Sequence, residues 1–289
     1  MGNQNIYNDR NMLQEIFHVD KPIIATLHLL SLPGSPYYSG EDIKDILQYT
    51  MDEVDILIDA GVNGLIIENH GDIPFIKPEK FGFETVAAMT YIAGEVKKVA
   101  DKSKIQIGIN CLANAPIPAL AIGKAVDVKF IRVNQFVNAY VSNEGIMDGQ
   151  AGNVLRYRKQ IGAEDIAIFA DVHVKHGSHS IVADRSISEQ AKDVLFFSGD
   201  VLICTGNRTG DPPNDNEINE IKVTPDTPVL IGSGTTAENV DHLLSIADGV
   251  IIASYFKDNG KWQNDVNEKR VQKFMNRVNE FRNSINETK

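Results

Sequence analysis

Short apolar segments recur along this chain and alternate with segments of helical periodicity. Eight of them are nearly continuous in Ile, Val and Leu, which is typical of strands buried on both faces of a parallel sheet. We predict strands at residues 23–27, 64–68, 105–109, 130–133, 166–172, 201–204, 229–231 and 250–253.

Between these strands, apolar residues return at helical spacing. The pattern predicts helices over residues 41–60, 84–100, 188–197 and 266–285, with Ser188 and Thr236 as N-caps and Gly61 and Gly199 as stops. We therefore predict a single (β/α)8 TIM barrel over residues 21–289, preceded by an N-terminal extension over residues 1–20 whose helix caps the barrel. A doubly wound open sheet is the alternative.

Composition narrows the class of partner. A net charge of −11 over 289 residues argues against nucleic acid or an anionic membrane as the main partner, because both require a basic surface. No run of about 18 apolar residues and no signal-like leader occurs, so we expect no membrane insertion and a cytoplasmic location. Cys111 and Cys204 each adjoin a predicted strand and are expected to be buried small residues rather than a disulfide.

The last two strands indicate a phosphate site. Gly232, Ser233 and Gly234 follow one strand, and Ala253 and Ser254 end the next. Glycine lets backbone N–H groups approach phosphate oxygens, and TIM barrels commonly bind phosphate after strands seven and eight. Lys257 is expected at the rim of this site, with a solvated surface role as the alternative.

Ionisable residues gather at the ends of other strands. Asp171, His173 and Lys175 alternate along one strand, so we expect them to share its inward face as an acid/base set, with a buried ion pair between Asp171 and Lys175 as the alternative. Glu68 and His28 also end strands. Glu68 is expected to be a base, a metal ligand or a hydroxyl acceptor, or else to pair with Arg132 across the top of the barrel. His28 is expected to be a catalytic acid or base or a metal ligand, with a core histidine bonded to a backbone carbonyl as the alternative.

Uncharged and basic groups complete the predicted site. They are expected to bind a polyhydroxylated substrate, and they are Asn69, Asn110, Arg132, Asn134 and Thr205. No compact metal motif occurs, although His28, Glu68, Asp171 and His173 together remain a conceivable set of ligands for a divalent cation. The polar segment at residues 206–216 is expected to be a loop, either a lid over the ligand or a surface loop.

Several segments together resemble the BtpA family, whose relatives include SgcQ-type proteins. The matching stretches begin at residues 27–36, 71–75 and 130–134 and continue at residues 170–176, 231–234 and 247–257. The resemblance implies a barrel of the ribulose-phosphate-binding type. It also implies either an enzyme of sugar or nucleoside metabolism or a role in photosystem I biogenesis.

Three functions follow from these observations. The first is an isomerase, epimerase or aldolase acting on a phosphorylated sugar or related metabolite. The second is a nucleosidase that cleaves an N-glycosidic bond, and the third is a non-enzymatic assembly factor. A homo-oligomer is expected by analogy with other barrels.

Overall fold

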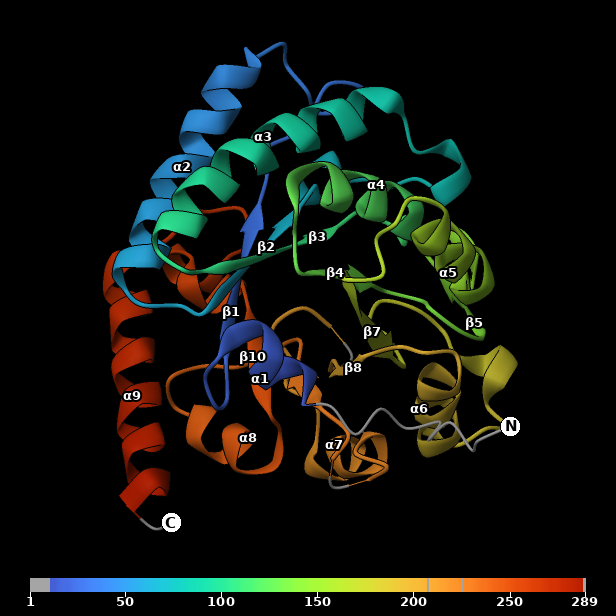
Figure 1. Cartoon of the computed structure of the whole chain (residues 1–289), viewed down its shortest axis with the longest axis vertical. Coiled ribbons are helices and arrows are strands. Elements are labelled where there is room, and N and C mark those ends of the chain that lie inside the picture. The colour runs from blue at the N-terminus through green and yellow to red at the C-terminus, as the bar shows by residue number, and fades with distance from the viewer. Residues whose placement is uncertain (1–10, 207, 225, 288–289) are drawn as a thin grey trace.

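The computed structural model describes residues 11–206, 208–224 and 226–287 and contains a closed parallel barrel (Figure 1). Its strands follow the spatial order β1-β10-β9-β8-β7-β4-β3-β2. The predicted TIM barrel is thus confirmed, with strand ends that differ from the predicted ones by a residue at most. The barrel strands are β1 (Ile23–His28), β2 (Gly64–Glu68), β3 (Gln106–Asn110), β4 (Phe130–Val133), β7 (Ala167–Val172), β8 (Val201–Cys204), β9 (Val229–Ile231) and β10 (Gly249–Ile252).

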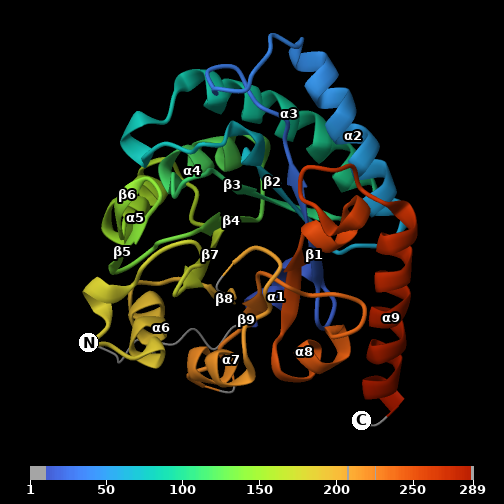
Figure 2. The ribbon, with the colours of Figure 1, turned by 180° about the vertical axis from the view of Figure 1, so that it is seen from behind.

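Helices form a ring around this barrel, as both ribbon views show (Figures 1 and 2). They are α2 (Ile43–Asp59), α3 (Phe83–Lys102), α4 (Pro116–Val126), α5 (Ala151–Gln160), α6 (Ile187–Phe196), α7 (Asp215–Ile221), α8 (Val240–Ile246) and α9 (Glu268–Glu287). Two predicted caps are wrong: Ser186 caps α6 through a reciprocal bond with Glu189, and Asn239 precedes α8. None of the described helices combines the length and apolar character that crossing a bilayer requires.

The N-terminal helix α1 (Met12–Phe17) lies against one end of the barrel and confirms the predicted cap. Its Leu13, Ile16 and Phe17 join the apolar side chains inside the barrel. Residues 1–10 lie outside the described residues, and the division of the chain at residue 20 stays a prediction. Because α1 fills the amino-terminal end, the opposite end is the one open to a ligand.

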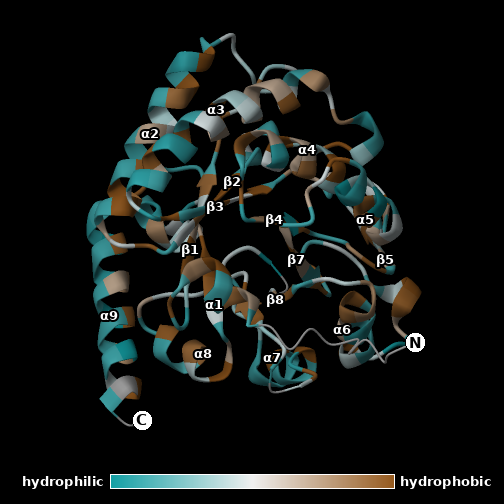
Figure 3. Ribbon diagram, viewed as in Figure 1, coloured by the Kyte–Doolittle hydropathy of each residue, from teal (hydrophilic) through white to brown (hydrophobic). Residues whose placement is uncertain are grey.

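Two apolar layers hold the barrel together. The larger lies between the outward faces of the strands and the helices, where the ribbon is hydrophobic (Figure 3). The smaller lies inside the barrel, where the rings of Phe130 and Phe169 stack at 4.4 Å and Phe17 packs edge-on against both. Gly108 of β3 makes room for Phe130, since a Cβ there would lie 2.3 Å from the ring.

A two-stranded hairpin interrupts the βα repeat. It consists of β5 (Ala139–Ser142) and β6 (Gly145–Asp148), inserted between β4 and α5. Val141 of the hairpin forms a bridge with Ser178, in the segment after β7. The sequence analysis did not predict this hairpin because its strands are short and partly polar. The hairpin stands at the carboxyl end of the barrel and forms part of the wall of the cavity described below.

The packing inside the barrel yields a prediction with a matched control. Gly108→Ala should lower the free energy of unfolding by about 1–3 kcal/mol, because the added methyl group collides with the Phe130 ring. Gly94→Ala, in the middle of α3, should raise it by about 0.5–1 kcal/mol, because a methyl group there would meet only Val126 at 3.8 Å. Urea unfolding of both variants measures the difference, and equal effects of the two substitutions would contradict this account of the barrel interior.

Candidate functional site

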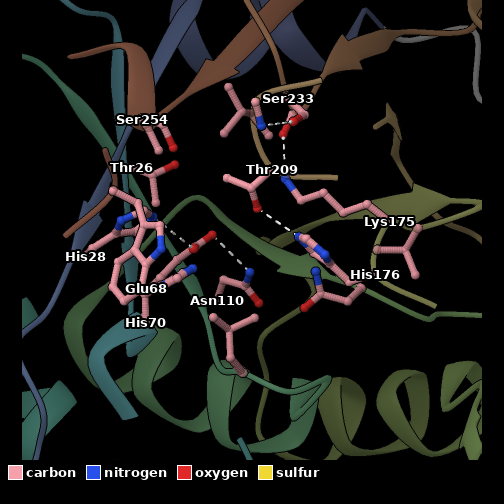
Figure 4. A pocket seen from close by; sticks show the side chains of 18 of the residues that line it. Thr26, His28, Glu68, His70, Asn110, Lys175, His176, Thr209, Ser233 and Ser254 are labelled. Atoms are coloured by element: carbon pink, nitrogen blue, oxygen red, sulfur yellow. Dashed lines mark hydrogen bonds and ion pairs between the residues drawn. The ribbon is translucent and has the colours of Figure 1, made fainter. Parts of the chain in front are cut away.

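A cavity of about 470 Å³ opens at the carboxyl ends of the barrel strands. This is the face on which TIM barrels place their chemistry. Figure 4 shows His28, His70 and Glu68 on one side of the cavity and Lys175 and His176 on the other. Ligand-sized concave sites with a few convergent polar groups are the usual form of a small-molecule site.

The floor of the cavity is organised by Arg132. Its guanidinium donates from Nε and Nη2 to the two carboxylate oxygens of Asp171, both at 3.0 Å, and from Nη1 to Glu68 Oε1 at 3.3 Å. Burial by itself lowers the pKa of Arg132, but the charges of Asp171 and Glu68 outweigh burial and raise it. Asn110 donates to the same Glu68 oxygen at 3.0 Å, so Glu68 Oε2 is the oxygen left to face a ligand. The predicted alternative pairing of Glu68 with an arginine is therefore present.

Two stacked imidazoles lie beside Glu68. The rings of His28 and His70 are 4.2 Å apart, and Trp262 covers His70 at 4.4 Å. His28 Nε2 lies 3.8 Å from Glu68 Oε2. Burial, followed by the charges of His70 and Lys257, holds the pKa of His28 well below its ordinary value. His28 is consequently a neutral imidazole at physiological pH, suited to donating or accepting one hydrogen bond.

Lys175 approaches from the other side of the cavity. Its Nζ donates to the carbonyl of Gly232 at 3.3 Å, and its backbone N–H donates to Thr205 Oγ1 at 3.0 Å. Burial, aided by the charge of Arg132, lowers the pKa of Lys175 to about 8. The ammonium and neutral amine forms therefore coexist near neutral pH.

Five of the six residues predicted for the phosphate site line the cavity, namely Gly232, Ser233, Gly234, Ala253 and Ser254. The first turn needs its glycines, because a Cβ on Gly232 would lie 2.7 Å from Ile203, and Gly234 has φ +70° with the backbone of Pro212 against it. Next to this turn, Thr235 Oγ1 is buried and has no hydrogen-bond partner among the described residues. The turn thus lines the cavity with backbone, and the unsatisfied hydroxyl of Thr235 lies buried in the wall behind it.

The loop predicted at residues 206–216 packs on this glycine turn. Gly210 N–H donates to Ser233 Oγ, which in turn donates to the carbonyl of Arg208, both at 3.2 Å. Thr209 Oγ1 lies 2.8 Å from His176 Nε2 across the cavity mouth. Asn207 lies outside the described residues, and the end of the predicted loop is instead the start of α7. The role of the loop as a lid stays a prediction.

The prediction that Asp171, His173 and Lys175 share one inward face is wrong. Strand β7 ends at Val172, and His173 takes the left-handed conformation, with φ +54°. Its ring therefore turns away from the cavity toward His179, at 4.0 Å, and Glu217, at 3.8 Å. Asp171 points inward but lies behind Arg132, and it pairs with that arginine rather than with Lys175.

Lys257 is also misplaced by the sequence prediction. Its side chain is 1% exposed and forms a buried ion pair with Glu53 of α2. It lies neither at the rim of the cavity nor in solvent, so both predicted alternatives are wrong. The 3-10 turn Ser254–Phe256 after β10 carries Lys257 outward, toward the helices.

The predicted substrate-binding residues divide into two groups. Asn110, Arg132 and Asn134 line the cavity, and Asn134 Oδ1 has no hydrogen-bond partner among the described residues. Asn69 instead ties two loops together through Asp72 and the backbone of Leu112. Thr205 is fully buried and holds the backbone of Lys175.

No group of three or more His, Cys, Asp or Glu side chains arranged to hold a metal ion occurs in residues 11–206, 208–224 and 226–287. The four predicted ligands do not converge, because His173 points away and Asp171 is bonded to Arg132. Cys111 and Cys204 are both buried free thiols, as predicted.

Several residues that line the cavity were not predicted from the sequence to be part of the site. His70 and Trp262 follow the second and last barrel strands, and Tyr140 and Glu144 come from the hairpin. His70, directly after Asn69 at a strand end, was the one with a signal in the sequence. Trp262 and the hairpin residues belong to loops whose path only the packed structure defines.

The depressed pKa of His28 predicts how stability depends on pH. A histidine whose pKa is lower in the folded state contributes stability above its unfolded pKa, near 6.5, and loses it as pH falls below that value. Below pH 6.5, the free energy of unfolding of the wild type should therefore fall relative to His28→Gln by up to about 1.4 kcal/mol per pH unit. Urea unfolding of both proteins between pH 7.5 and 5 checks this, and parallel curves would contradict it.

The fold is shared with solved structures of low sequence identity. Thiamine phosphate pyrophosphorylase from Pyrococcus furiosus superposes with a TM-score of 0.57 at 13% identity, covering 95% of this chain and 99% of that one. Phosphoribosyl anthranilate isomerase from Thermus thermophilus gives 0.54 at 11% identity, covering 90% and 98%. At these identities the likeness establishes the fold alone.

Sequence relatives are much closer. A mitochondrial protein of Caenorhabditis elegans is 37% identical over 93% of this chain and 98% of its own length. The photosystem I biogenesis protein BtpA of Synechocystis is 34% identical over 91% of this chain and 90% of its own. The model of the BtpA family matches residues 19–280. The chain therefore belongs to the BtpA family.

Proposed function

We propose that this protein is an enzyme that acts on a small phosphorylated carbonyl compound, of the sugar phosphate class, by removing a proton next to the carbonyl. The observation that carries the proposal is the layout of one cavity. Glu68 and His28 lie on one side, the glycine turn lies on another, and Lys175 reaches from the far wall to Gly232 of that turn. A substrate held by its phosphate at the turn would present its carbon chain to Glu68.

The phosphate would be bound by the backbone N–H groups of Ser233 and Gly234 and by Ser254, because the N–H of Gly232 already donates to the carbonyl of Cys204. Backbone N–H groups in a glycine turn form a concave anion site, and Thr235 Oγ1 offers a buried hydroxyl that has no partner among the described residues. Lys175 would add positive charge beside the phosphate. The two superposed proteins are named for a thiamine phosphate and for a phosphoribosyl compound, which agrees with a phosphate ligand in this fold.

Glu68 would remove the proton next to the carbonyl. Its Oε1 is held by Asn110 and Arg132, so the carboxylate is fixed with Oε2 available. As Oε2 takes a proton from the carbon next to the carbonyl, negative charge develops on the carbonyl oxygen. Lys175 would stabilise that charge, and the neutral His28 imidazole would donate or accept a hydrogen bond beside it. Isomerisation, epimerisation and aldol cleavage all share this step.

Ligand binding tests the proposal. We expect the unfolding temperature of the purified protein to rise with ribose 5-phosphate and glyceraldehyde 3-phosphate but not with ribose or glyceraldehyde. At about 100 times Kd the rise should be about 4–5 °C. Ser254→Asp should abolish it by placing a negative charge at the phosphate site, while Ser245→Asp, exposed on α8, should not.

The same panel separates the alternatives. Each ligand is tested with and without magnesium, manganese or zinc, together with nucleosides and inorganic phosphate. A rise for nucleosides that Ser254→Asp leaves intact would favour the nucleosidase. If no ligand raises the unfolding temperature, the proposal is overturned and an assembly role is favoured, as the name of the Synechocystis relative implies for that protein. The cytoplasmic location and the homo-oligomer stay predictions.

A further inference from the structure

The amine of Lys175 is buried inside the cavity without a counter-ion. Among the described residues, no carboxylate oxygen lies within the 4.0 Å ion-pair distance of its Nζ, and the hydrogen bond found for it goes to the neutral carbonyl of Gly232. Lys257 offers a contrast within the same protein, because it is fully buried and is paired with Glu53. Burying an unpaired ammonium is costly, so such a group favours its neutral, nucleophilic form.

Resting on the proposed function, we infer that Lys175 is a nucleophile: its Nζ attacks the carbonyl carbon of the phosphorylated substrate and forms a Schiff base. The inference goes beyond acid/base chemistry, because it replaces electrostatic stabilisation of the carbonyl oxygen by a covalent intermediate. It also narrows the substrate to an aldehyde or ketone.

The surroundings of Lys175 keep its amine reactive and fixed. Burial and, to a smaller extent, the nearby charge of Arg132 together lower its pKa to about 8, while the charges of Asp171 and Glu68 act in the opposite direction. The charge of Lys175 also lowers the pKa of the three imidazoles around it, which belong to His28, His70 and His176.

The backbone directs the amine toward the glycine turn. Positive φ angles at His173 and His176 turn the chain on either side of Lys175, and Thr205 accepts its backbone N–H. The side chain therefore crosses the cavity to Gly232, as Figure 4 shows for Lys175 beside Ser233. A carbonyl compound whose phosphate lies in that turn would place its carbon chain within reach of Nζ.

The chemical step balances within the site. The Nζ lone pair adds to the carbonyl carbon, and the two protons that the nitrogen of the ammonium form gives up pass to the oxygen. The C–O bond then breaks, the oxygen leaves as water, and a protonated imine remains. Loss of a proton from the adjacent carbon to Glu68 then moves the C–H electron pair into a C=C bond and neutralises the imine nitrogen as an enamine. No oxidant or reductant is required.

Borohydride trapping tests the inference on the whole protein. Glycolaldehyde phosphate is added at pH 7.5, the imine is reduced with borohydride, and modified lysines are quantified by peptide mass spectrometry. We expect Lys175 to be modified at least about tenfold faster than exposed Lys159, because a much larger fraction of its amine is neutral. Buried Lys257 should stay unmodified. Lys175 labelling should level off above about pH 8, whereas Lys159 labelling should continue to rise.

Controls separate this inference from the proposed function. Unphosphorylated glycolaldehyde should label Lys175 more slowly; equal rates would support the reactive amine and count against the phosphate site. Lys175→Arg keeps the charge and should lose the fast adduct while retaining the phosphate-dependent rise in unfolding temperature. Modification of Lys175 no faster than Lys159 in the wild-type protein would overturn the inference, whatever the phosphate panel shows.

Discussion

The site depends on one buried arginine held between two carboxylates. Arg132 satisfies both oxygens of Asp171 and shares Glu68 Oε1 with Asn110. Removing one partner from such a cluster leaves an uncompensated buried charge, which costs about 3–5 kcal/mol. The cluster fixes the orientation of Glu68 in the apolar barrel. Burial depresses the pKa of Lys175, and the charge of Arg132 adds to that effect while the two carboxylates oppose it. Arg132, on strand β4, thereby affects both the orientation of Glu68 on β2 and the pKa of Lys175 after β7.

Loops, as well as strand ends, line the cavity. The hairpin β5–β6, the turn after β9 and the segment that carries Trp262 all contribute walls to one cavity. Close backbone contacts hold loops at this end of the barrel in place. Gly71, after β2, lies against the backbone of residues 29–31, and Gly234, after β9, lies against Pro212. Loops fixed in this way by a rigid barrel can position a ligand to the accuracy that proton transfer and covalent chemistry require.

The site was predicted well where residues alternate along a strand and poorly where the strand ended. Glu68, Asn110 and Arg132 lie within strands, at or near their carboxyl ends, and their predicted place at those ends brings them to the cavity. His173 lies one residue past the end of β7, where its positive φ breaks that period. Lys257 failed for a similar reason, since the turn after β10 reverses the direction of its side chain toward Glu53.

The sequence by itself determined the barrel, because eight buried parallel strands need continuous apolar runs and leave that mark in the chain. It also determined which strand ends carry polar chemistry, since ionisable residues stand out against those runs. Only the tertiary structure decided which of these groups meet. Arg132 pairs with Asp171 of another strand, and His28 stacks on His70 of another segment. The Lys175 amine reaches the carbonyl of Gly232, which lies after a different strand. Burial and neighbouring charges in the assembled cavity then set the pKa values of these groups. Neither burial nor the neighbouring charges can be deduced from the spacing of residues along the sequence.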